Sequence, residues 1–333
     1  MANEFRTLDA HSAEYFGDTR DYWWNADFLA LMGRRLALDR VRDALDVGCG
    51  VGHWGQLLIG LLAGDARIAG VDRDPRWVAT ATERAAARGL SARCRYEVGT
   101  AETLPFADAS FDLATCQTVL IHVRDPAAAI AEMARVVRPG GLILAVEPNN
   151  AAGSLILDSI SFDDPLDDVL ARARLQLTCE RGKAALGEGN NSIGDLVPGL
   201  FARQGLVDIC VYLSDKANAV VPPYASAEQR AMLEERADFM RRDFWIWSRA
   251  DTRRYFVAGG GPEREFDALW AVAMGGRERF DAAVAARTYA ASGAAIGYLI
   301  AGRPRADAAP PRRRSAGRSV RPARRCAPHR SRA

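Results

Sequence analysis

The stretch "ALDVGCGVGHWG", residues 44–55, decides the fold, because it packs a strand-like run, an acid and four glycines into twelve residues. It contains two overlapping glycine motifs. From Gly48 it reads G-x-G-x-G, with Asp46 just ahead of the first glycine. From Gly50 it reads G-x-G-x-x-G, the dinucleotide fingerprint. The two registers predict different cofactors.

The position of the acid favours the first register. We expect the strand to end at Val47, so that Gly48 follows it at once and Gly50 lies two residues further on. A carboxylate at Asp46 would repel a pyrophosphate, but it can accept a hydrogen bond from an ammonium group. That arrangement suits the aminoacyl end of S-adenosylmethionine. Asp72, at the end of the next predicted strand, suits a ribose diol with either cofactor and does not discriminate.

The chain alternates short apolar strands with helical segments, which predicts an α/β fold: a doubly wound, seven-stranded, mostly parallel sheet of the Rossmann-like kind. The expected strands are residues 43–48, 66–72, 92–99, 111–117, 141–148, 206–214 and 291–302, the last of them a strand or a helix. The expected helices between them are residues 53–62, 74–89 and 126–141.

Three segments make up the expected domain organisation. Residues 1–40 are predicted to form an N-terminal helical lid, and residues 303–333 a disordered tail rich in Arg, Pro and Ala. Residues 41–302 are expected to form the main domain, with mostly helical insertions at about 149–190 and 225–290.

Composition narrows the class of protein. Hydrophobic residues make up 49% of the chain and charged residues 26%. These proportions are those of an ordinary globular protein, and no apolar run is long enough to span a bilayer. Six scattered cysteines without a C-x-x-C pair indicate reduced thiols in the cytoplasm and no metal site.

Charge is distributed unevenly along the chain. From Arg303 onward the chain carries eleven arginines and one acid, a charge of +10. Because the net charge of the whole chain is +2, residues 1–302 carry a charge of −8. Such an acidic body argues against nucleic acid as a partner. The tail either binds an anion or has no function.

Residues 40–150, and more loosely a further helix and strand at 193–214, resemble the class I S-adenosylmethionine-dependent methyltransferases. The resemblance rests on the glycine loop, on "GVDRDP" (70–75), on "AETLPF" (101–106) and on "RPGG" (138–141). Within the family, the chain looks like the subgroup that acts on small molecules. It implies transfer of a methyl group from S-adenosylmethionine to an O, N or C atom of a small metabolite. The alternatives are an RNA or protein substrate, or a protein that binds the cofactor without transferring methyl.

The resemblance also implies which residues hold the cofactor. They are Asp46, Gly48, Cys49, Gly50, Gly52, His53, Asp72, Arg73, Thr100, Ala101, Glu102, Gln117 and Thr118. Thr100 departs from the family, which often has an acid there, so we expect backbone and packing to hold the adenine. Asp46 has a second interpretation, in which it caps the following helix.

His122 is the candidate general base, because it follows the fourth strand near the expected methyl group; the alternative is a packing role. A set of aromatic residues is expected to wall an apolar pocket for the acceptor. They are Tyr22, Trp23, Trp24, Trp245, Trp247 and Tyr255. Their other interpretations are the core of a helical cap or a homodimer surface. The Pro-Pro-aromatic motif of nucleic-acid amino methylation is absent after the fourth strand.

Overall fold

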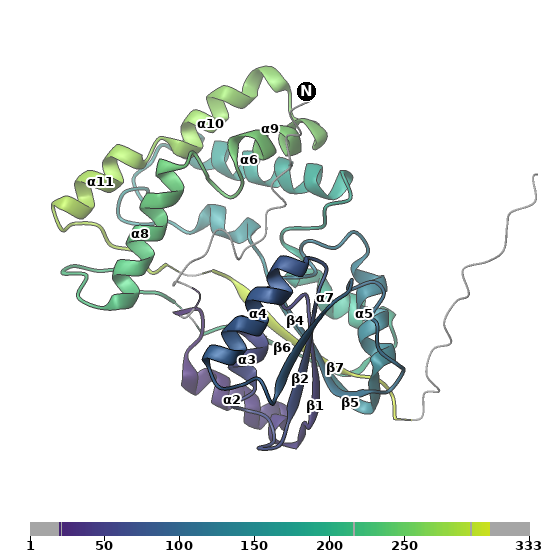
Figure 1. The fold of residues 1–333 in the computed structure, drawn as a ribbon. Helices are drawn as coiled ribbons and strands as arrows, with labels where there is room; N and C mark the ends of the chain where they lie inside the picture. The colour runs from purple at the N-terminus through teal and green to yellow at the C-terminus, as the bar shows by residue number, and fades with distance from the viewer. Residues whose placement is uncertain (1–19, 21, 216, 294, 307–333) are drawn as a thin grey trace, which may run out of the picture.

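The computed structural model describes residues 20, 22–215, 217–293 and 295–306. Half of the predicted lid (residues 1–19 and 21), and the predicted tail from residue 307 onward, lie outside these residues. The described chain builds a seven-stranded sheet in the order β3-β2-β1-β4-β5-β7-β6, in which only β7 runs antiparallel to its neighbours (Figure 1). The strands are β1 (Asp43–Val47), β2 (Arg67–Asp72), β3 (Cys94–Val98), β4 (Phe111–Gln117), β5 (Val137–Pro148), β6 (Val207–Leu213) and β7 (Gly297–Arg303). The predicted doubly wound, mostly parallel sheet is confirmed.

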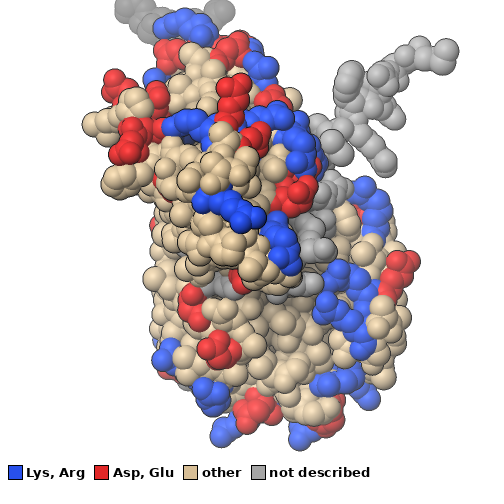
Figure 2. Space-filling model, turned by 90° about the vertical axis from the view of Figure 1, so that its left-hand side faces the viewer, with Lys and Arg blue, Asp and Glu red and all other residues tan. Residues whose placement is uncertain are grey.

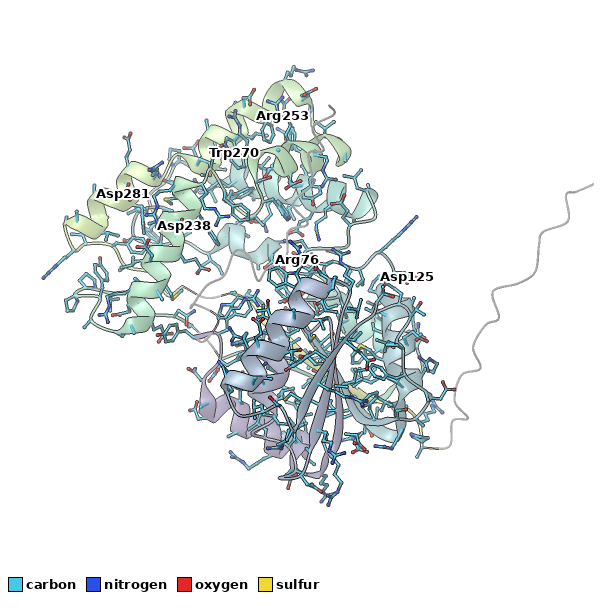
Figure 3. The ribbon with its side chains drawn as sticks, in the orientation of Figure 1. Arg76, Asp125, Asp238, Arg253, Trp270 and Asp281 are labelled. Atoms are coloured by element: carbon cyan, nitrogen blue, oxygen red, sulfur yellow. The ribbon has the colours of Figure 1, made fainter. Side chains whose placement is uncertain are left out.

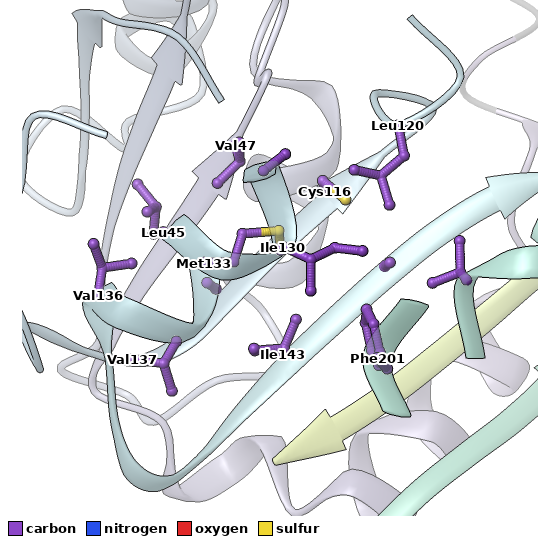
Figure 4. Close-up of a cluster of buried hydrophobic side chains, with 14 of the residues drawn as sticks. Leu45, Val47, Cys116, Leu120, Ile130, Met133, Val136, Val137, Ile143 and Phe201 are labelled. Carbon is purple, nitrogen blue, oxygen red and sulfur yellow. The ribbon is translucent and has the colours of Figure 1, made fainter. Parts of the chain in front are cut away.

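Helices cover both faces of the sheet because the strand residues alternate between two apolar layers. On β1, Leu45 and Val47 face one hydrophobic cluster and Ala44 faces the other. The first cluster is covered by α5 (Pro126–Val136) and α7 (Val197–Arg203); Figure 4 shows Ile130, Met133 and Phe201 packed over the strands there. The second cluster is covered by α2 (Ala26–Leu36), α3 (His53–Leu58) and α4 (Pro75–Ala87). The described part of the N-terminal region therefore packs on the sheet through α2.

In the structure, β5 begins before the "RPGG" stretch, which is earlier than predicted. We expected a helix to residue 141 and a strand from there, but α5 ends at Val136 and the sheet pairing begins at Val137, which lies opposite Phe111. The pairing then shifts, and the next partners are Leu113 and Leu142. Gly140 has a φ of 75°. This left-handed conformation allows the chain to bulge between the two pairings.

The two insertions form a helical cap. After β5 the chain continues through η3 (Ala151–Leu155) into α6 (Leu166–Ala185) and then η4 (Ile193–Leu196). The second insertion supplies α8 (Ala227–Arg241), α9 (Arg249–Ala258), η5 (Glu263–Glu265), α10 (Phe266–Met274) and α11 (Arg277–Ala285). In Figure 1 this cap forms a separate layer on the side where β4 and β5 end.

Figure 3 shows the orientation of the sheet relative to the cap. Arg76 and Asp125, at the N-terminal ends of α4 and α5, lie on the side of the sheet that faces the cap. Those helix starts follow the C-terminal ends of the parallel strands, the edge at which open α/β sheets bind their ligands. Trp270 lies within the cap, where it joins a hydrophobic core of its own. In the described ranges no helix is both long and apolar enough to cross a bilayer.

Two glycines allow α6 and α9 to touch through their backbones. A Cβ added to Gly182 on α6 would overlap the carbonyl oxygen of Tyr255, and one added to Gly259 would overlap that of Thr178. Neither glycine has a positive φ. The close approach of the two helices therefore explains why glycine is present, and the contact leaves no room for even a methyl group.

We therefore expect Gly182→Ala to destabilise the cap. Alanine gains up to about 1 kcal/mol of helix propensity over glycine, but forcing the helices apart should exceed this gain and leave a net loss of about 1–3 kcal/mol. Gly199→Ala in α7 is the matched control, because its added Cβ meets only the end of the Arg203 side chain. Urea unfolding measures both variants, and an unchanged or higher midpoint for Gly182→Ala would contradict the packing argument.

Candidate functional site

The glycine loop after β1 adopts a conformation that only glycine tolerates well. The φ values are 64° for Gly48, 50° for Gly50 and 74° for Gly52. A Cβ on Gly48 would lie 2.5 Å from Val119, and one on Gly52 would lie 2.8 Å from the hydroxyl of Tyr96. The loop thus passes close to the segment that follows β4 and to a side chain of β3, as a backbone cradle for a ligand must.

Gly55 has a different role from the three loop glycines. It lies inside α3, and a Cβ there would stand 2.9 Å from Oδ2 of Asp46 and 3.3 Å from Ile68. The G-x-G-x-x-G register therefore ends on a residue that brings the helix close to the sheet. This is a packing position.

Asp46 is buried beneath the glycine loop. Its side chain is 1% exposed, and Oδ2 accepts a hydrogen bond from the Gly55 amide at 2.9 Å. Burial raises the pKa of this carboxyl group to about 7, and the charge of Asp72 adds to the rise, although the Gly55 amide opposes it. The contact with the first turn of α3 is the capping arrangement foreseen as the second interpretation of Asp46. Contact with an ammonium group stays a prediction.

Asp72 connects the end of β2 to the glycine loop. Its Oδ2 accepts from the Gly50 amide at 2.9 Å, and its Oδ1 accepts from the Asp74 amide at 3.0 Å. It is 5% exposed. The carboxylate thus holds the loop open in the conformation that the ribose of a nucleoside would meet.

The remaining predicted cofactor residues surround this edge of the sheet. Cys49 is buried, and burial raises the pKa of its thiol, which stays protonated at neutral pH. His53 is a buried residue at the start of α3. The others follow the ends of β2, β3 and β4: Arg73 and Thr100 are exposed, and Ala101, Glu102 and Gln117 are half-buried.

Thr118 has an unusual backbone conformation for threonine, with a φ of 54°. Its amide donates to the Val146 carbonyl at 2.8 Å. This bond to β5 holds the residue in place, and backbone strain of this kind is often found where a chain lines a ligand site.

Sequence reasoning missed two residues that hold the turn after β4. Glu147, at the end of β5, is 1% exposed and accepts the amides of Val119, Leu120 and Ile121 at 3.0, 2.9 and 3.3 Å. Burial raises its pKa to about 7, against the lowering effect of the three amides. Lys183 of α6 is 3% exposed, and its Nζ donates to the Ile121 carbonyl at 2.6 Å.

A sequence signal for each of these two residues existed. Glu147 is an acid at the C-terminal end of a predicted strand, the same position that singled out Asp46 and Asp72. Lys183 is one of only two lysines in a chain with 44 basic residues. No sequence pattern, however, indicates that residues 62 positions apart, such as Lys183 and Ile121, are in contact.

His122 and the predicted aromatic residues lie in separate places. His122 is exposed on the turn after β4, and its amide donates to the Val119 carbonyl at 2.9 Å. Trp24 packs on Trp54 of α3 with ring centroids 5.2 Å apart. Tyr22 and Trp23, just before it, are half-buried.

The aromatic residues of the second insertion lie in the core of the cap. Trp247 and Tyr255 are each 5% exposed and pack edge to face, and Trp245 lies against the same cluster. The Tyr255 hydroxyl donates to Glu188 at 2.7 Å. Among the described residues, no group of three or more His, Cys, Asp or Glu side chains could hold a metal ion.

Comparison with known proteins identifies relatives of this chain. A family model described as "Methyltransferase domain" matches residues 45–145. The ubiquinone biosynthesis O-methyltransferase of Thiobacillus denitrificans is 31% identical over 162 residues, which cover 45% of this chain and 68% of that protein. The uncharacterized methyltransferase YcgJ of Bacillus subtilis is 33% identical over 147 residues, covering 44% of this chain and 55% of YcgJ. The crystal structure of YcgJ aligns with 84% of this chain and 99% of its own, at 19% identity and a TM-score of 0.45.

A doubly wound sheet with the strand order 3-2-1-4-5-7-6, and a glycine loop flanked by two buried acids, defines a nucleoside-binding α/β protein. The chain belongs to the class I S-adenosylmethionine-dependent methyltransferases. It covers only 33%, 55% and 51% of the length of the first three curated relatives, from Streptomyces fradiae, Bacillus subtilis and Geobacillus stearothermophilus.

The two raised carboxyl pKa values predict how stability depends on pH. Asp46 and Glu147 have pKa values of about 7 in the folded protein and lower values when unfolded, so the folded state binds more protons between about pH 4 and 7. The free energy of unfolding that these groups contribute should therefore fall as the pH rises through this window. Asp46→Asn combined with Glu147→Gln should reduce the fall by more than about 1 kcal/mol, since one pKa unit corresponds to about 1.4 kcal/mol.

Asp112→Asn serves as the control for this measurement. Burial of Asp112 opposes its charge, but hydrogen bonds from the amides of Asp43 and Arg42 outweigh this and lower its pKa. Its stabilisation is therefore lost as the pH falls. Urea titrations at pH 5 and pH 7.5 compare the variants with the parent chain. Parallel pH curves for the double variant and the parent would refute the assignment.

Proposed function

We propose that this protein transfers a methyl group from S-adenosylmethionine to an O, N or C atom of a small molecule. The observation that carries the proposal is the edge where β1, β2 and β4 end, which places a glycine cradle, two buried carboxylates and a fixed turn together. The ubiquinone biosynthesis enzyme among its relatives is named as an O-methyltransferase, and others are named demethylmenaquinone methyltransferases. These names support a small acceptor.

The residues at this edge fit the proposed cofactor. Gly48, Gly50 and Gly52 let the backbone approach it, Asp72 would accept from the ribose hydroxyls, and Asp46 would face the aminoacyl end. Thr100, Ala101 and Glu102 would flank the adenine, with Arg73 beside it and Gln117 and Thr118 at the methionine end. Bound S-adenosylmethionine supplies a methyl group on a positively charged sulfur.

Positioning is the main contribution of the protein to such a displacement. The reaction needs the acceptor atom and the methyl carbon in line at near contact, with water excluded. A base is needed only when the acceptor must lose a proton. His122 is the residue proposed for that role, since its turn lies at the methionine end. Tyr22, Trp23 and Trp24 are proposed to line the acceptor side, with Trp245, Trp247 and Tyr255 supporting it from the cap.

We infer further that the protein acts in the cytoplasm on a small molecule and not on nucleic acid. The net charge of −8 over residues 1–302 supports this. On the face of the cap in Figure 2, acidic and basic side chains are interspersed. Arg253 and Asp267 of the cap form one exposed ion pair. The Arg-rich tail of residues 303–333 as a recruiting arm for a polymer substrate stays an alternative, and so does a homodimer. Loss of activity only on a polymer substrate in a chain ending at Gly302 would favour the polymer substrate.

Substitution of Asp72 tests the cofactor assignment. Asp72→Ala should weaken binding of S-adenosylhomocysteine by about 1–3 kcal/mol, because it leaves buried donors without an acceptor. Asp39→Ala, at an exposed position before β1, is the control and should bind normally. Isothermal titration calorimetry measures both affinities, and unchanged binding by Asp72→Ala refutes the ribose assignment.

Methyl transfer itself needs a separate measurement. Incubation with methyl-labelled S-adenosylmethionine and a fractionated cell extract should label a small-molecule fraction in the presence of the parent chain. Tight cofactor binding without any labelled product would overturn the proposed activity in favour of a protein that only binds the cofactor.

A further inference from the structure

The turn after β4, residues 118–122, is held at both ends by buried charges. The three amides that point out of its start are accepted by Glu147, and the carbonyl at its end, that of Ile121, accepts from Lys183. A carboxylate thus faces the positive end of the peptide dipoles and an ammonium group faces the negative end. Both charges are therefore placed where they stabilise the turn.

The segment after α6 presses on the same carbonyl group. Gly189 has a φ of 91°, and a Cβ added to it would overlap the oxygen of Ile121 and crowd the backbone of His122. The backbone of Ile121 is therefore packed against Gly189 and bonded to Lys183 at the same time. Residues of the cap segment as well as residues of the sheet therefore hold the backbone of Ile121 in place.

Lysine is a conspicuous choice at position 183. The chain contains 42 arginines and two lysines, Lys183 and Lys216. Arg135, which is equally buried at 3% exposure, bonds to Glu132, Asp108 and the carbonyls of Phe106 and Leu104. Arginine thus serves where several acceptors converge, whereas the single carbonyl of Ile121 needs only one charged donor.

The charges around Lys183 come from three directions. Glu180 lies one turn earlier on α6, Glu188 lies in the segment that follows, and Glu147 faces it from β5. Arg254 and Tyr255 of α9 both bind Glu188 and so reach Lys183 only through it. Burial outweighs the three carboxylates and lowers the pKa of Lys183 to about 8.

We propose that Lys183 is a positioning residue, which fixes the turn after β4 from the cap and thereby shapes the wall at the methionine end of the cofactor. The role at the cofactor rests on the proposed function. The hydrogen bond by which Lys183 holds the Ile121 carbonyl, called the clamp below, does not. Since α6 belongs to the cap and the turn belongs to the sheet domain, this one bond makes the geometry of the turn depend on how the cap is seated.

Hydrogen exchange of the ligand-free protein tests the clamp. In Lys183→Met, which keeps the apolar stem but loses the donor, the amides of Val119, Leu120 and Ile121 should exchange at least about tenfold faster, as expected when a hydrogen bond to a charged group is removed. Arg181→Met is the matched control, because Arg181 is an exposed basic residue on the same helix. It should leave these amides unchanged.

A conservative variant separates positioning from packing. Lys183→Arg restores a charged donor and should return exchange toward the parent rate. If Lys183 only filled space, methionine would be the better replacement, and Lys183→Met would exchange more slowly than Lys183→Arg. If Lys183→Met exchanges like the parent, or if exchange rises equally throughout α6 and the sheet, the positioning role is wrong.

The parent chain supplies a test that does not depend on a folded variant. Above about pH 8 the amine loses its charge and its bond to Ile121 weakens. Glu147, which accepts the three amides, is already charged above its pKa of about 7, so the test window begins at pH 8. Protection of the three amides, corrected for intrinsic exchange, should therefore fall between pH 8 and 10 while that of amides in β1 does not. Constant protection across this range overturns the proposal.

Two nucleosides separate the clamp from the proposed function. Lys183→Met should weaken binding of S-adenosylhomocysteine several-fold but leave 5′-methylthioadenosine, which lacks the aminoacyl end, unchanged. An equal loss for both ligands would contradict a role at the methionine end. If the parent chain binds neither nucleoside, the proposed function fails, and the exchange experiment still decides whether Lys183 fixes the turn.

Discussion

Buried carboxylates hold the backbone at the C-terminal edge of this sheet. Asp72 at the end of β2 accepts the amide of Gly50 in the loop after β1, and Glu147 at the end of β5 accepts three amides of the turn after β4. Asp46 does the same for the start of α3. Asp72 and Glu147 thus order segments that follow a neighbouring strand, and Asp46 orders the helix that follows its own strand. Because a buried amide without a partner is costly, these bonds determine where the loops can lie.

Burial destabilises the charged forms of two of these acids. Burial raises the pKa of both Asp46 and Glu147 to about 7, so each is close to being protonated at neutral pH. A cationic group brought against Asp46 would favour its charged form and recover part of the lost solvation. The aminoacyl ammonium group of S-adenosylmethionine would be such a cation if it binds at Asp46 as proposed.

The sheet was largely predictable from the sequence, because its signals are local. The strand at residues 111–117 has the predicted bounds, and Asp72 lies at the end of β2 as expected. The start of β5 was not predictable, since the bulge at Gly140 depends on pairing with β4. The cap could not be resolved either: an aromatic residue such as Trp247 shows the same pattern whether it walls a pocket or fills a core. Lys183 was missed because its partner is distant in the sequence.

The contact between α6 and α9 differs from an ordinary contact between helices. Helices usually meet through a layer of interdigitating side chains, with their axes about 8–10 Å apart. At Gly182 this layer is missing, and the backbones of the two helices touch directly. Lys183 is the next residue along α6, and its ammonium group donates to the Ile121 carbonyl. Two adjacent residues of α6 therefore set both the approach of α9 and the position of the turn after β4.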